Sequence, residues 1–256
     1  MRHILAALVL VAGMLGTQSA EAATVLITGS NRGLGFEFAK QYAEAGWNVI
    51  ATCRSPDQAD ELKALATKHN NISIERLDVL NEGEIAALAQ KYKGKPIDVL
   101  INNAGILGDV PTQTFGSVDR ANFDRIMDTN VYGAISVTEA FRDNVVASDE
   151  KKIVALTSLM GSIAATGPSH TFYRASKAAL SMSMRVINGH LRRDGVVVGL
   201  VAPCVADTDM LKEFGYEGPM TVSAETAVTG MRNVIANLTQ ETAAKPINCD
   251  GKPFEW

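Results

Sequence analysis

Short apolar runs alternate with longer segments of helical period from residue 24 to the end of the chain. Runs that are apolar on both faces, such as TVLIT at 24–28, are typical of buried parallel strands. The pattern predicts strands over residues 24–28, 48–52, 72–77, 97–101, 152–157, 196–202 and 245–249. It predicts helices over residues 33–45, 57–68, 82–92, 119–144, 171–192 and 224–238.

This alternation predicts an α/β domain, with a mostly parallel seven-stranded sheet covered by helices on both faces. No Pro-, Gly- or Ser-rich linker, short-period repeat or low-complexity segment divides the chain, so we expect one domain over residues 23–256. Ligands of such doubly wound sheets bind beyond the carboxyl ends of the strands. Candidate site residues are therefore expected directly after strands.

Composition narrows the possible partners and ligands. The 256 residues are 46% hydrophobic and 20% charged, with a net charge of −4 and no cluster of Lys and Arg. A nucleic-acid partner is not expected, because phosphate binding needs clustered basic side chains. Cys53, Cys204 and Cys249 are far apart and odd in number, so we expect neither a disulfide framework nor a metal-binding pair. The histidines lack ligand spacing as well, and no metal is predicted.

Residues 1–22 have the pattern of a secretory signal: a polar start at Arg2, an apolar run over 4–15 and an Ala20-Glu21-Ala22 cleavage site. The run is shorter than the roughly 20 apolar residues of a membrane span, so no stable span is expected. The pattern predicts export to a periplasm or another outside compartment. Two arguments oppose it. Translation from Met14 would leave a cytoplasmic protein, and compartments outside the cytoplasm usually lack a reduced cofactor, which would matter if the chain proves to be a reductase.

A glycine-rich turn joins the first predicted strand to the first helix. It consists of Gly29, Ser30, Asn31, Arg32, Gly33, Leu34 and Gly35. Glycines let a phosphate approach the backbone N–H groups at a helix N-terminus. Such turns are often only tight connections, but this position at the head of an α/β domain favours a dinucleotide site.

The end of the second strand indicates which dinucleotide is preferred. NAD-binding sites usually place a carboxylate there, and this chain has Arg54 instead, with Arg32 nearby in the turn. Guanidinium groups suit the 2′-phosphate of NADP, although both could be ordinary surface arginines. Asp78 and Val79 end the third strand. The Asp78 carboxylate could accept a hydrogen bond from the adenine amino group, or could cap the following helix.

Tyr173 and Lys177 lie four residues apart on one face of a predicted helix. A phenol with a pKa near 10 is a poor base at neutral pH, and a nearby ammonium would lower that pKa. Taken alone, a Tyr-x-x-x-Lys pair is usually an ordinary pair on a helix surface.

The motifs together resemble the short-chain dehydrogenase/reductase family over residues 24–210. The matching segments, in family order, are Thr28-Gly29-x-x-x-Gly33-x-Gly35, Asn102-Asn103-Ala104-Gly105, Asn130-Val131-Tyr132-Gly133, Ser158 after the fifth strand, and Tyr173-x-x-x-Lys177. The glycine turn and the closing DGKPFEW over 250–256 are similar to the carbonyl-reductase-like branch of C-factor and sniffer types. The resemblance implies a single Rossmann domain and hydride transfer between NADP(H) and a carbonyl or alcohol carbon.

The resemblance also implies roles for individual residues. Tyr173 would exchange the substrate proton, Lys177 would bind the nicotinamide ribose, and Ser158 would hydrogen-bond the substrate oxygen. Asn130 would hold a water of the proton relay. Ser162 is a less favoured alternative to Ser158, because it lies further from the end of the strand.

Further cofactor contacts are implied at Asn103, Ala104, Gly105, Pro203 and Thr208. The chain departs from the family after the sixth strand, where Cys204 replaces the usual glycine. A cysteine side chain there could shift the nicotinamide or narrow the pocket.

Residues 106–117 and 204–221 are expected to wall a pocket for a small, mostly apolar substrate, or else to complete the core under a long loop. A catalytically weak NADPH-binding regulator is the alternative to an active reductase. His170 lies near Tyr173, but no acid is placed to orient it, so a Ser–His hydrolase is not expected. The chain could be a monomer or a homo-oligomer.

Overall fold

A central parallel sheet organises the chain in the computed structural model, which describes residues 22–256 except Glu217. The signal-like segment lies outside the described residues, apart from Ala22. The strands of the sheet, in spatial order, are β3 (Ile72–Arg76), β2 (Asn48–Cys53), β1 (Thr24–Ile27), β4 (Val99–Asn102), β5 (Lys152–Leu156), β6 (Val197–Ala202) and β9 (Pro246–Asn248). Every pairing between these strands is parallel, which confirms the predicted seven-stranded doubly wound sheet.

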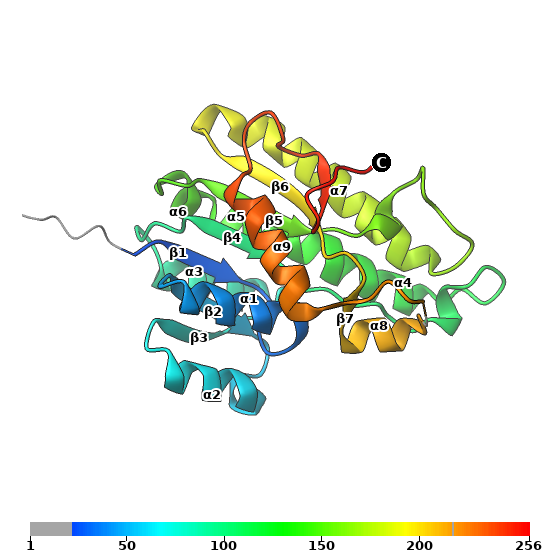
Figure 1. Ribbon diagram of the computed structural model, residues 1–256, viewed down its shortest axis with the longest axis horizontal. Helices are drawn as coiled ribbons and strands as arrows, with labels where there is room; N and C mark the ends of the chain where they lie inside the picture. Colours follow the sequence, from blue (N-terminus) through cyan, green and yellow to red (C-terminus); the bar gives the residue numbers. More distant parts are fainter. Residues whose placement is uncertain (1–21, 217) are drawn as a thin grey trace, which may run out of the picture.

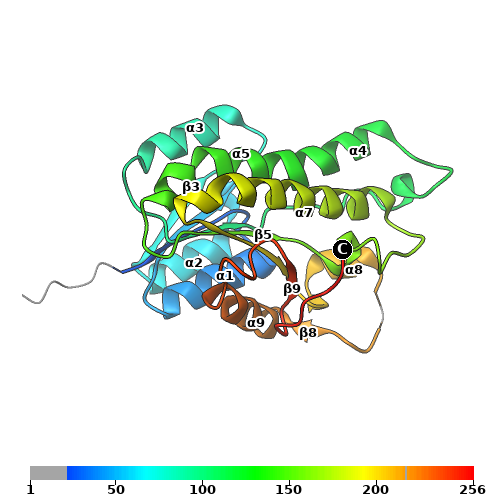
Figure 2. The ribbon, with the colours of Figure 1, turned by 90° about the horizontal axis from the view of Figure 1, so that it is seen from above.

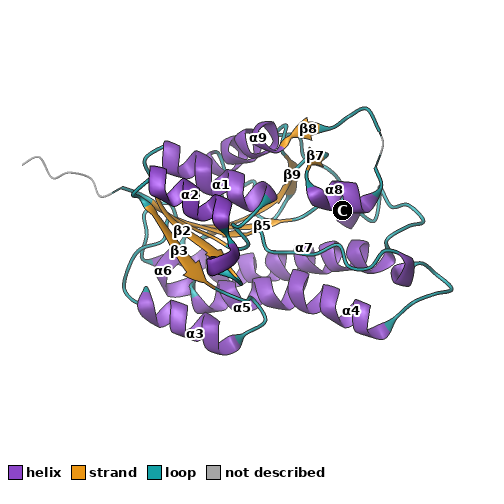
Figure 3. Ribbon diagram, turned by 90° about the horizontal axis from the view of Figure 1, so that it is seen from below, coloured by secondary structure: helices purple, strands orange, loops and turns teal. Residues whose placement is uncertain are grey.

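Helices cover both faces of the sheet and give three layers (Figures 1 and 2). On one face lie α1 (Gly33–Glu44), α2 (Asp60–Lys68) and α9 (Ala224–Ala236), which bury Phe38, Leu62 and Met231 against the strands. On the other face lie α3 (Glu82–Lys91), α5 (Gly133–Ala140) and α7 (Thr171–Leu191), as Figure 3 also shows. The two faces carry separate buried apolar clusters, as expected for strands that are apolar on both sides.

The predicted helix over 119–144 is wrong in detail. It is divided into α4 (Arg120–Met127), a π-helical turn (Asp128–Tyr132), α5 and α6 (Arg142–Val146). The π-helical turn contains Asn130, one of the predicted catalytic residues. Such turns insert an extra residue into a helix and are frequent at functional sites.

A small unit that the sequence did not predict follows β6. It comprises β7 (Ala206–Asp207), α8 (Asp209–Phe214) and β8 (Val222–Ser223), with β7 paired to β8. This unit lies beyond the carboxyl end of the sheet, on the same side as the glycine turn after β1 (Figure 1). Strand order reverses between β1 and β4, so the crevice between their carboxyl ends is the expected ligand site.

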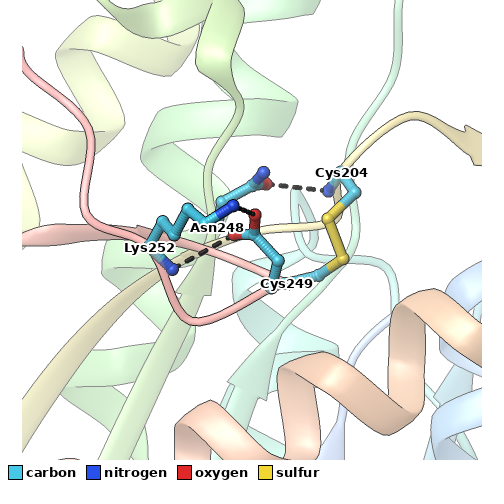
Figure 4. The surroundings of a disulfide bond; sticks show 5 residues. Cys204, Asn248, Cys249 and Lys252 are labelled. Carbon is cyan, nitrogen blue, oxygen red and sulfur yellow. Dashed lines mark hydrogen bonds and ion pairs between the residues drawn. A yellow bond between two sulfur atoms is a disulfide. The ribbon is translucent and has the colours of Figure 1, made fainter. Parts of the chain in front are cut away.

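A disulfide joins Cys204 to Cys249, which corrects the expectation that the three cysteines form no disulfide framework (Figure 4). The residues are 45 positions apart in the chain, with their Cα atoms 5.4 Å apart. They meet because each follows the end of a strand, and those strands, β6 and β9, are neighbours in the sheet. Cys53 is a free, buried cysteine.

Within the described part of the chain, no helix is both long and apolar enough to cross a membrane. The same residues contain no group of three or more His, Cys, Asp or Glu side chains placed to hold a metal ion.

Candidate active site

A cavity of about 780 Å³ lies at the carboxyl end of the sheet. This is the size of a cofactor or drug-sized ligand site. Most predicted cofactor residues line it: Gly29, Asn31, Arg32, Gly33, Leu34, Gly35, Arg54, Asp78, Val79, Asn103, Ala104, Gly105, Tyr173, Lys177, Pro203 and Thr208. The exception is Ser30, which is fully buried and donates from its hydroxyl to the carbonyl of Ile27.

The glycine turn is shaped by contacts that exclude larger residues. Gly29 has a φ of 70°, and a Cβ at Gly35 would collide with the Gly29 carbonyl. The Asn103 amide holds the turn from β4 by donating to the carbonyls of Thr28 at 2.7 Å and Gly29 at 3.0 Å. A Cβ at Gly33, by contrast, would meet only a Thr208 methyl carbon at 3.9 Å. The turn is therefore closed on its protein side and open toward the cavity.

The N-terminus of α1 fits a phosphate group. Its N-cap residue, Arg32, makes no side-chain capping bond, and the first turn of α1 holds no acidic residue. The free N–H groups of a helix start carry partial positive charge and favour an anion. The turn and α1 together form a cradle that suits the pyrophosphate of a dinucleotide.

Arg32 and Arg54 are exposed and line the cavity. Neither guanidinium makes an ion pair with a carboxylate of the described residues. Asp78 also lines the cavity, and its carboxylate accepts a hydrogen bond from the Leu80 N–H at 3.0 Å. The alternative role of Asp78 as a helix cap is wrong, because Asn81 caps α3 by accepting from the N–H of Glu84.

Tyr173 and Lys177 face the cavity from the first turns of α7, and both are buried. The Lys177 Nζ atom lies 5.7 Å from the centre of the Tyr173 ring and donates to the Leu156 carbonyl at 2.8 Å. Burial raises the pKa of Tyr173 to about 12, and a hydrogen bond with Ser158 acts in the opposite direction. Burial lowers the pKa of Lys177 to about 8. Around neutral pH the pair is therefore a phenol beside an ammonium.

Asn130 lies behind this pair and is almost fully buried. Its amide donates to the carbonyl of Ile106 at 2.9 Å and to the Ser176 hydroxyl at 3.0 Å. Ser176 in turn donates to the Tyr173 carbonyl at 2.8 Å, so hydrogen bonds connect the π-helical turn to α7. Gly105 leaves space beside Asn130 and Lys177, because a Cβ at this position would lie 3.2 Å from the Asn130 oxygen and 3.7 Å from Lys177 Nζ. Asn130 itself does not line the cavity.

Ser158 follows β5 and begins a short 3₁₀ turn, where its hydroxyl accepts from the N–H of Met160 at 3.2 Å. The Ser158 side chain acts on the Tyr173 phenol and opposes the rise of its pKa. Ser162, the alternative, is buried and accepts from the Ala165 N–H. The geometry therefore favours Ser158 over Ser162 as the partner of Tyr173.

Gln113 is a buried residue of the site that the sequence did not reveal. The N-cap residue of α7, His170, makes no side-chain capping bond. The Gln113 side-chain oxygen instead accepts from the Tyr173 N–H at 3.0 Å. Its amide nitrogen donates to the carbonyls of Leu107 at 3.0 Å and Asp109 at 3.4 Å. A single amide thus connects the loop after β4 to the residue predicted to carry the proton.

The opposite wall of the cavity follows β6 and includes Pro203, Thr208, Asp209, Met210 and Glu213. The Met210 sulfur lies 4.0 Å from the Tyr173 hydroxyl. At the end of α8, the Phe214 ring stacks on that of His170 with ring centres 4.0 Å apart. Burial lowers the pKa of His170, and neither of its ring nitrogens has a hydrogen-bond partner among the described residues. His170 is therefore a packing residue for this wall.

Comparison with known proteins relates this arrangement to characterised relatives. A family model described as short chain dehydrogenase matches residues 23–217. The C-signal of Myxococcus xanthus is 36% identical over 163 residues, which are 63% of this chain and 93% of that protein. The NADPH-bound carbonyl reductase from chicken fatty liver has a TM-score of 0.84 and 29% identity, covering 92% of this chain and 99% of its own. The carbonyl reductase Sniffer of D. melanogaster has a TM-score of 0.83 and 26% identity, covering 92% of this chain and all of its own.

Proposed function

The chain belongs to the short-chain dehydrogenase family and is an NAD(P)-dependent oxidoreductase, and on that premise we propose that it reduces carbonyl groups with NADPH. The observation that carries the proposal is that Tyr173 and Lys177 line the same cavity as an uncapped helix start behind a glycine turn. Ser158 does not line this cavity, but its side chain acts on the Tyr173 phenol. A proton donor and a dinucleotide cradle are the two parts that this chemistry requires.

The preference for NADPH is proposed from the charges at the rim of the cavity. Arg32 and Arg54 can both donate to a 2′-phosphate, and β2 ends without the carboxylate that would hold a free 2′-hydroxyl. The pyrophosphate would lie at the start of α1, and Asp78 would accept from the adenine amino group. When bound, NADPH supplies the hydride.

The residues around Tyr173 would handle the charge that develops on the substrate oxygen. The Ser158 hydroxyl would donate a hydrogen bond to that oxygen, and the Tyr173 phenol would give it a proton. The Lys177 ammonium favours a phenolate once that proton has left. Asn130 is connected to α7 by its hydrogen bond to Ser176, which in turn donates to the Tyr173 carbonyl. Asn130 could also hold a relay water, as in the family.

We propose a small, mostly apolar carbonyl compound as the substrate class. Ile106, Leu107 and Met210 contribute apolar surface to the cavity near Tyr173. Tyr216 and Met220 are exposed and do not line the cavity. Only part of the 204–221 segment would therefore contribute to substrate specificity in the proposed pocket.

The test is NADPH oxidation, measured at 340 nm with a panel of aldehydes and ketones, for the wild type and Tyr173→Phe. We expect wild-type turnover and at least a hundredfold loss in the variant, since general acid catalysis typically contributes about 10²–10⁴. Tyr173→Phe should retain its affinity for NADPH. If the wild type binds NADPH and reduces no member of the panel, the regulatory alternative is favoured over the reductase.

We also propose that the protein is exported. The signal-like pattern of residues 1–22 supports this, and so does the Cys204–Cys249 disulfide, because such bonds persist in oxidising compartments. N-terminal sequencing of the protein purified from its native cell should find a chain that begins close to Ala23. A chain that begins at Met14 would contradict export.

A further inference from the structure

The backbone at Cys204 has a conformation that cysteine rarely adopts. Its φ of 59° lies in the left-handed region, where a Cβ is crowded and glycine is the usual residue. A cysteine persists in such a conformation only when its surroundings hold it there. Local interactions at Cys204 must therefore offset the strain.

Two interactions from the end of β9 hold Cys204 (Figure 4). The disulfide ties its side chain to Cys249, and its N–H donates to the Asn248 side-chain oxygen at 3.0 Å. Cys249 is itself fixed, since it is buried and its carbonyl packs so closely on Gly230 of α9 that a Cβ there would collide with it. The disulfide thus connects the start of the β6-side wall to a rigid part of the core.

The segment held in this way contributes to the cavity on both sides of Cys204. Pro203 precedes it directly, and Thr208 follows four residues later as the N-cap of α8. Thr208 lies near Gly33 of the phosphate turn, while Met210 lies near the Tyr173 hydroxyl. This wall therefore covers the part of the cavity between the pyrophosphate cradle and the proton donor.

We propose that the Cys204–Cys249 disulfide is a positioning element for the nicotinamide half of the cofactor. With the bond intact, Cys204 keeps its left-handed backbone, and Pro203 and Thr208 lie where they can contact the nicotinamide. Without the bond, Cys204 relaxes and this wall shifts, while the adenosine half of the site is unchanged. The inference rests on the proposed function, because it assigns a role within the same NADPH site.

The test compares two ligands in the oxidised and reduced full-length protein. Dithiothreitol breaks the S–S bond, leaves a proton on each sulfur and is itself oxidised to a cyclic disulfide. The Kd of NADPH, measured by fluorescence, should rise about tenfold on reduction, equivalent to about 1.4 kcal/mol. The Kd of 2′-phospho-ADP-ribose, which lacks the nicotinamide, should not change. Thiol titration verifies that the bond was open.

Two variants separate the effect of losing the disulfide from the effect of the strained Cys204 backbone on NADPH affinity. Cys249→Ser leaves an unheld Cys204, and should bind NADPH as weakly as the reduced wild type without any reductant. Cys204→Gly also lacks the bond, but glycine adopts the left-handed backbone without strain. It should bind NADPH nearly as well as the oxidised wild type and should not respond to dithiothreitol. Circular dichroism verifies folding, and if Cys249→Ser does not fold, the reduced wild type and Cys204→Gly still decide the matter.

Several outcomes would overturn this inference. Unchanged NADPH affinity on reduction would show that the bond does not position the cofactor, although the proposed function would stand. Equal weakening of both ligands would show a global loss of structure instead of a local role. If Cys204→Gly binds NADPH as weakly as Cys249→Ser does, the proposed role of the disulfide is also contradicted. If the oxidised wild type binds neither ligand, the proposed function itself fails.

Discussion

On the β4 side of the cavity, residues 106–117 are fastened by buried amide side chains, whereas on the β6 side residues 203–214 are fastened by a covalent bond. Gln113 and Asn122 make the β4-side contacts, with hydrogen bonds to the backbone at Leu107 and Asp109. The β6-side wall starts at the Cys204–Cys249 disulfide. Amide hydrogen bonds can be lost one at a time, while a disulfide is either present or absent.

If the proposed function is right, this difference would place proton transfer and cofactor binding under separate control. The β4-side loop is bonded to the Tyr173 backbone through Gln113. Among the described residues of the β6-side wall, Met210 contacts the Tyr173 hydroxyl through its sulfur at 4.0 Å. A change in the β6-side wall should therefore alter cofactor affinity first, and a change in the β4-side loop should alter turnover first.

The largest expected effect is on stability when the disulfide is removed. Closing a loop of this length restricts the unfolded chain and stabilises the fold by roughly 4 kcal/mol. Cys249→Ser should lose about that free energy of unfolding in urea at equilibrium. Reductant should destabilise the wild type to a similar extent and leave the variant unchanged. A variant as stable as the oxidised wild type would show that the bond does not stabilise the fold.

The second expected effect follows from Gln113→Leu. The substitution leaves the Tyr173 N–H and the Leu107 carbonyl without their partner, at a cost of about 1–3 kcal/mol for each unsatisfied buried group. We expect kcat to fall while the Kd of NADPH is nearly unchanged. Gln113→Glu, which keeps the acceptor for Tyr173, should recover part of kcat. A variant that loses only cofactor affinity would contradict the separation of the two walls.

The third prediction concerns the pH dependence of turnover, which should not depend on the state of the β6-side wall. The pKa of Lys177 is lowered to about 8, so the side chain is charged below that pH and neutral above it. If the ammonium is needed, kcat/KM for reduction should fall above pH 8 by up to about tenfold for each pH unit. The decline should be the same in oxidised and reduced protein, because Lys177 is bonded to β5. Lys177→Arg stays charged and should lack the decline, whatever its overall rate.

The smallest expected effect follows from Phe214→Ala, which removes the stack on His170. Such ring pairs contribute about 0.5–1.5 kcal/mol beyond their burial. We expect a modest rise in the KM for NADPH, larger in the reduced protein, where the disulfide no longer holds the β6-side wall. Equal effects in both redox states would show that the stack and the disulfide act independently.

Sequence pattern predicts the strands and most helices because their signals are local. A buried parallel strand is a short apolar run, and β1, β2 and β6 stand out for that reason. The π-helical turn at Asn130 was missed because its residues keep the helical pattern, and only packing against Ser176 and Ile106 marks the break. Asp78 and Asn81 both lie where a helix cap is possible, and backbone geometry assigns the cap to Asn81.

The features that tie the site together are long-range, and so they lie beyond sequence pattern. Gln113 is an ordinary polar loop residue until the fold brings it to Tyr173, 60 positions later. Cys204 and Cys249 become partners only because β6 and β9 are neighbours. An unusual cysteine two residues after a buried strand was the available signal, and it indicated a change in the pocket without revealing its partner.

The most direct test of the account follows the hydride itself. The wild-type protein would be incubated with NADPH that carries deuterium at C4 in one or the other configuration, together with a ketone that it reduces. We predict that one of the two labelled forms transfers a single deuterium to the former carbonyl carbon of the alcohol, as mass spectrometry would detect, and that Tyr173→Phe gives almost no labelled product. Alcohol formed without deuterium from either form would contradict the central claim.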